Sequence, residues 1–185
     1  MSIYLQRDLK RRIAQVAVGA SALRNQGGTG LIDKCRYYFE HKIDLQAFAF
    51  SMEDSKIYGA FLDRHTKTLQ NDFNLPFKNW GAARKALNLY FRDTVYNKYF
   101  SEHFLPAHTH DAYEKLISVL EVPLDKYVAN GVIEDSASKL LIWPGIKHLT
   151  KSVSNKFQAE ANKIADQIGI ARVHLDLKYY RKIGS

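Results

Sequence analysis

The sequence predicts an all-α protein. Apolar residues recur at helical spacing along most of the chain, and no segment alternates cleanly between apolar and polar residues as a half-buried strand does. The β-branched residues are scattered rather than clustered. With 185 residues, of which 46% are apolar, the chain is long enough to bury a core within one domain.

The first half of the chain carries four segments with the pattern of a helix, and two short segments lie between residues 42 and 52. In chain order the four are residues 3–23, 30–41, 53–70 and 81–100. The stretch NQGGTG breaks the first of them, and Thr29 can cap the second. Breaks are expected near Asp44 and Ser51, and Pro76 interrupts the connection that precedes the fourth helix.

The second half predicts four more helices. They are residues 109–121, 123–131, 150–168 and 174–183. Pro106 precedes the first of these helices and Pro123 begins the second, while Trp143-Pro-Gly forms a turn. Gly169 closes the third. We expect a single helical domain over residues 1–185, with a possible division into two lobes, one of residues 1–22 plus 123–185 and the other of residues 23–122.

The chain is basic, and its charge is unevenly distributed. The net charge is +8 and the isoelectric point is about 9.5. Residues 77–100 hold five Lys/Arg against one Asp, and residues 144–185 hold eight against three acidic residues, whereas residues 101–143 have three Lys against seven acidic residues. A fold that joined the two basic regions would have a positive face, which favours a polyanionic partner.

Cysteine usage and hydropathy exclude several classes of protein. With the single Cys35, neither a disulfide framework nor a multi-cysteine zinc or iron–sulfur site can form. The N-terminus lacks the apolar core of a signal peptide, and no run approaches the roughly 20 apolar residues of a membrane span. His103, His108 and His110 have no nearby carboxylate or cysteine pattern, so a polar loop is favoured over a metal site. We therefore expect an intracellular protein without membrane attachment, metal or cofactor.

The stretch WGAARKALNLYF, residues 80–91, contains the strongest candidate for chemistry. Arg84 and Lys85 lie near the start of a predicted helix, where free backbone N–H groups and the helix dipole favour anions. Lys85 is either an ordinary solvated lysine or part of a surface that faces an anion. We adopt the second interpretation as our hypothesis.

Four segments of the chain, in order, resemble the helix-hairpin-helix DNA glycosylases, which include endonuclease III and the archaeal 8-oxoguanine glycosylases. GAARKALN, with Gly81, Arg84, Lys85 and Asn88, resembles the hairpin helix whose lysine is the family's nucleophile. The matching segments around it are SALRNQGGTGLIDKC with Gln26, VPLDKYVANGV with Asp125, and GIARVHLDLKYY with His174 and Asp176. The chain departs from the family in a hairpin turn without a second glycine and in the 40 residues between Lys85 and Asp125.

We expect the protein to be a monomer. The resemblance implies an enzyme that binds double-stranded DNA, flips out a damaged or modified base and removes it, with an oxidised purine as the expected base. Lys85 would be the nucleophile, Asp125 would stabilise positive charge on the sugar, and Gln26 would enter the base stack. The other implied roles are phosphate contacts by Lys78, Arg84, Lys147 and Lys151, and a base pocket formed by Trp80, Tyr90, Trp143, His174 and Asp176.

Other interpretations stay open at this point. Asp125 could be a helix N-cap, Gln26 a loop residue, and the tryptophans parts of the core. The whole protein could be a helical DNA-binding protein without catalysis. Arg36-YYFE-His41 also matches the Arg-x4-His pattern of the helical HEPN ribonucleases, although residues five apart on a helix do not share a face well.

Overall fold

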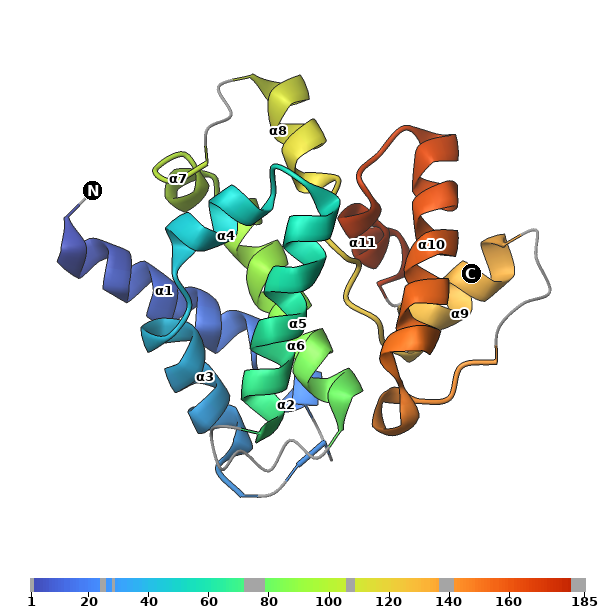
Figure 1. Cartoon of the computed structure of the whole chain (residues 1–185), viewed down its shortest axis with the longest axis horizontal. Helices are drawn as coiled ribbons and strands as arrows, with labels where there is room; N and C mark the ends of the chain where they lie inside the picture. Colours follow the sequence, from blue (N-terminus) through green and yellow to red (C-terminus); the bar gives the residue numbers. More distant parts are fainter. Residues whose placement is uncertain are drawn as a thin grey trace.

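The structure is a computed structural model that describes residues 2–23, 26–27, 29–71, 79–105, 109–136 and 142–180. Within these ranges it contains helices and no strand, so the all-α prediction is confirmed (Figure 1). α1 and α3 to α6 form one bundle, and α9 to α11 pack beside it (Figure 1).

The helices agree closely with the predicted segments and differ mainly at their ends. In chain order they are α1 (Ile3–Ala17), α2 (Ala20–Leu23), α3 (Leu31–His41), α4 (Leu45–Ser51), α5 (Ser55–Asn71), α6 (Trp80–Tyr96), α7 (Lys98–Ser101), α8 (His110–Ile117), α9 (Lys126–Asp135), η1 (Ile146–His148), α10 (Lys151–Ile168), η2 (Arg172–His174) and α11 (Leu175–Tyr179). Side-chain oxygens cap many of them, as short polar residues do at helix starts. These capping residues are Ser2, Asp44, Asn79, Asn97, Thr109, Asp125 and Thr150.

The predicted helices over residues 109–121 and 123–131 also differ from α8 and α9 at their ends. Three other boundary predictions were wrong for local reasons. The helix expected over residues 3–23 breaks at Val18 and Gly19. The helix expected over residues 81–100 breaks at Asn97, whose side chain accepts a hydrogen bond from the Phe100 amide and so starts α7. Thr29 does not cap α3, which begins instead after Gly30 at a φ of 79°, a left-handed conformation that glycine adopts without strain.

Two hydrophobic cores divide the molecule near residue 121. The first core contains the apolar faces of α1 to α6 and includes the stacked ring pairs Phe39–Tyr90 and Phe48–Phe91. The second core joins α9, α10 and α11. Because α1 packs on α3 and α6, its apolar face belongs to the first core, and the lobe boundary expected at residue 22 was wrong.

The segment between the cores is bound by the C-terminal helices. Gln158 of α10 accepts a hydrogen bond from the Val122 amide at 3.0 Å and donates one to the Val122 carbonyl at 2.8 Å. Arg172 donates to the carbonyl groups of Val119 and Leu120 at 3.0 and 3.1 Å. These bonds satisfy backbone groups that would otherwise be buried unpaired, and they fix the path of the connection.

Gly131 allows α9 and α11 to pack closely, and a side chain there is expected to destabilise the second core. A methyl group at Gly131 would overlap the ring of Tyr179. Gly131→Ala should therefore lower the free energy of unfolding in urea by about 1–3 kcal/mol, the usual cost of overpacking. Gly59→Ala is the matched control, because Gly59 lies within α5 with open space around it. That change should raise stability by about 0.5–1 kcal/mol, and equal effects at the two sites would contradict the packing argument.

His65 is expected to make folding stability depend on pH. Burial, aided by the charge of Arg64, lowers the pKa of His65 to about 4, and its Nδ1 lies 2.6 Å from the Tyr38 hydroxyl. Between about pH 6.5 and 4 the unfolded chain takes up this proton more readily than the folded one, so stability falls as the pH falls, by up to about 3 kcal/mol. Urea unfolding across this range should show a smaller decline in His65→Gln. The exposed His103→Gln should behave like the unaltered protein, and an unchanged decline in His65→Gln would refute the assignment.

Candidate active site at the junction of the two cores

The connection between the cores lies against the first turns of α6. Glu121 is held there by Arg84 and Asn88. The guanidinium of Arg84 donates to both carboxylate oxygens of Glu121, at 2.9 and 3.1 Å, and Asn88 donates to one of them at 2.9 Å. Arg84 also donates to Asp63 and Thr66 of α5, each at 3.1 Å. α6 is thereby tied to α5 on one side and to the connection on the other.

The surroundings of Arg84 do not favour the role predicted for it. Its side chain is only 3% exposed, and its charge is balanced by two carboxylates. A phosphate group could reach this guanidinium only by displacing those partners, so this geometry argues against the predicted phosphate contact. The Trp80 ring lies 5.1 Å from the guanidinium carbon and covers it further.

Lys85 and Asp125 come together although 40 residues separate them. Lys85 Nζ lies 3.4 Å from Asp125 Oδ2. The other carboxylate oxygen, Oδ1, accepts hydrogen bonds from the Tyr127 and Val128 amides at 2.9 and 3.1 Å and caps α9. Asp125 is therefore a helix N-cap and also a partner of Lys85, with one oxygen for each.

The Lys85–Asp125 pair is partly shielded from water. The Lys85 side chain is 9% exposed and that of Asp125 is 29% exposed, so the pair is reached from the Asp125 side. An amine and a carboxylate held together with little water can exchange a proton with each other or with a bound substrate. The geometry thus suits acid–base or nucleophilic chemistry, and it also suits a structural ion pair.

Two further pairs continue along the same side of α6 and contact the C-terminal elements. Arg92 forms an ion pair with Asp176 of α11, and the Tyr96 hydroxyl lies 2.7 Å from His174 Nδ1. Burial raises the pKa of Asp176, an effect that Arg92 opposes and the charge of Asp125 reinforces. Lys85, Arg92 and Tyr96 recur at helical spacing, so one face of α6 carries a row of polar contacts to the second core.

The residues predicted for a base pocket do not form one group. Tyr90 is fully buried, stacked on Phe39 at 4.5 Å, so its predicted role was wrong. Trp80 and Trp143 are half-buried and pack against the second core, Trp143 edge-on to Phe157 at 5.5 Å. Asp176 of α11 and His174 of η2 lie beside a later part of α6. Asp176 pairs there with Arg92, and His174 pairs with Tyr96.

The predicted phosphate-binding lysines are available on the surface where the structure describes them. Lys147 is exposed in η1, which packs on α6 where Gly81 leaves room for the Ile146 carbonyl. Lys151, at the start of α10, is 56% exposed and pairs with Asp63. Lys78 lies outside the described residues.

Gln26 lies beside the start of α6 and is half-buried. Its backbone carbonyl accepts a hydrogen bond from the Asn79 side chain at 3.2 Å. Because Asn79 caps α6 through the Ala82 amide, the Gln26 backbone is tied to the helix that carries Lys85.

The residues of the ribonuclease interpretation lie in separate environments. Arg36 donates to the carbonyl groups of Val18 and Gln15 at 2.9 and 3.2 Å and so binds the end of α1. His41 lies at the end of α3, with its ring 4.3 Å from that of Tyr37. Because the Arg36 guanidinium is bonded to backbone carbonyls, it does not form a shared site with His41. This geometry gives the ribonuclease interpretation no support.

The partners of Arg84 were missed by the sequence argument. Glu121 and Asp63 lie 37 and 21 residues from Arg84, and no local pattern relates them.

Within the part of the chain that the structure describes, no three His, Cys, Asp or Glu side chains form a group that could hold a metal ion.

Comparison with family models, with curated proteins and with solved structures found no match to this chain. None of the described helices combines the length and the hydropathy required to cross a bilayer.

Proposed function

We propose that the protein is a DNA glycosylase with abasic-site lyase activity, which extrudes a damaged or modified base, with an oxidised purine as the expected target, and removes it through Lys85 and Asp125. The observation that carries the proposal is the 3.4 Å approach of Lys85 Nζ to Asp125 Oδ2 at the junction of the two cores. An amine and a carboxylate are the groups that such a reaction requires. The resemblance of the surrounding segments to the helix-hairpin-helix glycosylases gives the reaction class.

The proposed chemistry needs an amine that can attack carbon. Asp125 Oδ2 would accept a proton from Lys85, and the lone pair of Nζ would then form a bond to the 1′ carbon of the sugar. The bond from that carbon to the base nitrogen breaks, and its electron pair leaves with the base, which takes up a proton. The sugar ring then opens: a proton moves from the nitrogen to the ring oxygen as the bond between that oxygen and the 1′ carbon breaks, which gives the protonated Schiff base. Loss of a proton from the 2′ carbon then expels the 3′ phosphate and cleaves the strand.

DNA binding is supported by the charge distribution. The net charge is +8, and the exposed Lys147 and Lys151 belong to elements that pack near the start of α6. Lysines that neutralise phosphates release counterions, so the logarithm of the binding constant should fall linearly with the logarithm of the salt concentration.

A second candidate function follows from the same ion pair. If Lys85 and Asp125 serve to hold the connection on α6, the protein would be a helical DNA-binding protein without catalysis. Asp125 already caps α9, and the neighbouring Arg84–Glu121 contact is structural, so a structural Lys85–Asp125 pair is chemically consistent.

Borohydride trapping distinguishes the two functions. The protein is incubated with duplex DNA that contains an abasic site or one of a panel of oxidised and alkylated bases, in the presence of borohydride. The lyase function predicts a covalent protein–DNA adduct, because borohydride reduces the Schiff base to a stable amine. Tight, salt-dependent binding without an adduct on any of these duplexes would reject the lyase and select the non-catalytic binder.

A further inference from the structure

A cavity of about 670 Å³ lies at the far end of α6, away from the Lys85–Asp125 pair. Its volume falls within the range of small-molecule sites, roughly 300–1,000 Å³. Lys85 and Tyr96 are eleven residues apart on α6, which is about 16 Å along the helix axis. A base attached to a sugar at Lys85 cannot extend that far, so this cavity is a separate site from the proposed active site.

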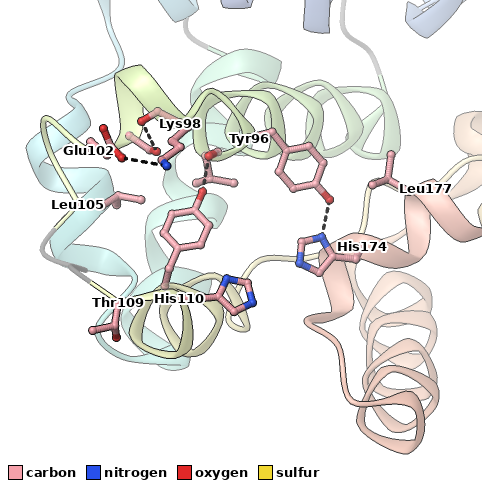
Figure 2. A pocket seen from close by; sticks show the side chains of 11 residues that line it. Tyr96, Lys98, Glu102, Leu105, Thr109, His110, His174 and Leu177 are labelled. Carbon is pink, nitrogen blue, oxygen red and sulfur yellow. Dashed lines mark hydrogen bonds and ion pairs between the residues drawn. The ribbon is translucent and has the colours of Figure 1, made fainter.

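Four ring side chains line the cavity, and they come from three parts of the chain. Figure 2 shows Tyr96 and His174 on one side and His110 across from them. The four rings are those of Tyr96, His110, Tyr113 and His174. Leu105 and Leu177 add apolar surface. Walls of this kind favour a flat, largely apolar ligand that can lie against ring faces.

A chain of hydrogen bonds fixes the polar character of one wall. Glu114 Oε2 lies 3.2 Å from His174 Nε2, and His174 Nδ1 lies 2.7 Å from the Tyr96 hydroxyl. A neutral imidazole that donates Nε2–H to the carboxylate must accept at Nδ1, so Tyr96 donates its hydroxyl hydrogen to His174. The Tyr96 oxygen then keeps its lone pairs for another donor, and this wall accepts hydrogen bonds.

The charges around this wall favour a donor or a cation. Glu114 carries a negative charge behind His174, and Arg92, the nearest cation on α6, is paired with two carboxylates, Asp93 and Asp176. At the rim, Lys98 and Glu102 pair with each other at 3.7 Å, as Figure 2 shows, and offset each other's charge. The excess of carboxylates next to aromatic faces is suited to a ring that bears an amino group.

We propose that this cavity is a binding site for a flat heteroaromatic amine, with the ring between the aromatic side chains and the amino group donating to the Tyr96 oxygen. The site does not depend on the proposed lyase function, because it shares no residue with the Lys85–Asp125 pair.

The test uses two probes that differ by one amino group, 2-aminoquinoline and quinoline, and isothermal titration calorimetry on the full chain. We expect 2-aminoquinoline to bind about tenfold more tightly than quinoline, which has no N–H donor. Tyr96→Phe should weaken the amine about tenfold and leave quinoline unchanged. Tyr99→Phe is the matched control, since Tyr99 is exposed and does not line the cavity, and it should alter neither affinity.

A second variant blocks the cavity without disturbing the core. Leu177 is 61% exposed, so Leu177→Trp should fold normally while the larger ring fills the space and abolishes binding of both probes. Three results would overturn the proposal: no saturable binding of 2-aminoquinoline up to about 5 mM, equal affinities for the two probes, or unchanged binding in Leu177→Trp. An unchanged difference between the probes in Tyr96→Phe would overturn the assignment of Tyr96 as the acceptor.

Discussion

Lys85→Gln is expected to abolish borohydride trapping and to slow strand cleavage at an abasic site by at least about 10³-fold in single-turnover assays. A glutamine amide has no basic lone pair, so no Schiff base can form. The side chain can still donate a hydrogen bond to Asp125, so the contact that holds the connection against α6 is retained. Thermal unfolding should therefore change little, and the loss can be assigned to chemistry.

Lys147→Gln is the matched control for that variant. Lys147 is exposed in η1 and is not within the Lys85–Asp125 pair, so trapping should persist at saturating protein concentration. Binding should weaken, and the slope of log K against log salt should decrease by about 1 if Lys147 contacts a phosphate. Adduct formation by Lys85→Gln at the rate of the unaltered protein would reject Lys85 as the nucleophile.

Asp125→Asn separates the two roles of Asp125. Asparagine is as good an N-cap as aspartate, so the bonds to the Tyr127 and Val128 amides are retained and α9 should stay folded. The substitution removes the negative charge beside Lys85, which should lower the trapping rate by about 10²–10⁴-fold. A variant that folds and reacts like the unaltered protein would limit Asp125 to its capping role.

The sequence identified most helices because their ends carry physical signals that act locally. The helix predicted over residues 150–168 is α10, which ends at Gly169 in a left-handed conformation, as predicted. Thr150 precedes the helix and caps it with its side chain. The breaks at Gly19 and Asn97 were missed because the apolar spacing continues across them. At both positions the apolar residues keep their helical spacing although the backbone leaves the helical conformation.

The site residues were harder to predict because their environments depend on contacts between distant parts of the chain. The approach of Lys85 to Asp125 was expected only from the resemblance, since nothing in their spacing requires it. Tyr90 was misplaced because α6 is buried on all sides from Gly81 to Phe91. A helix whose side chains are apolar or ion-paired on every face lies at the centre of a fold. The run of alanine, leucine and aromatic residues in this segment could have indicated such a central helix.

Arg84→Met is expected to lower the free energy of unfolding by about 3–5 kcal/mol, because it leaves the Glu121 carboxylate, which is only 11% exposed, without its cation. Urea denaturation measures the change. Glu121→Gln alone should also destabilise, and the double variant should lose less than the sum of the two, since one interaction accounts for both. Arg11→Met is the control, as the exposed Arg11–Asp8 pair should contribute no more than about 1 kcal/mol.

The same Arg84 variant tests whether Arg84 is a structural residue or a phosphate contact. If Arg84 is a structural anchor, Arg84→Met should leave the salt dependence of DNA binding unchanged in conditions where the protein is folded. A loss of stability below about 1 kcal/mol, together with a smaller salt slope, would instead make Arg84 a phosphate contact and would refute the inference from its burial. The expected combination, low stability with an unchanged slope, follows because the guanidinium is occupied by Glu121 and Asp63 and fixes the connection that brings Asp125 to Lys85.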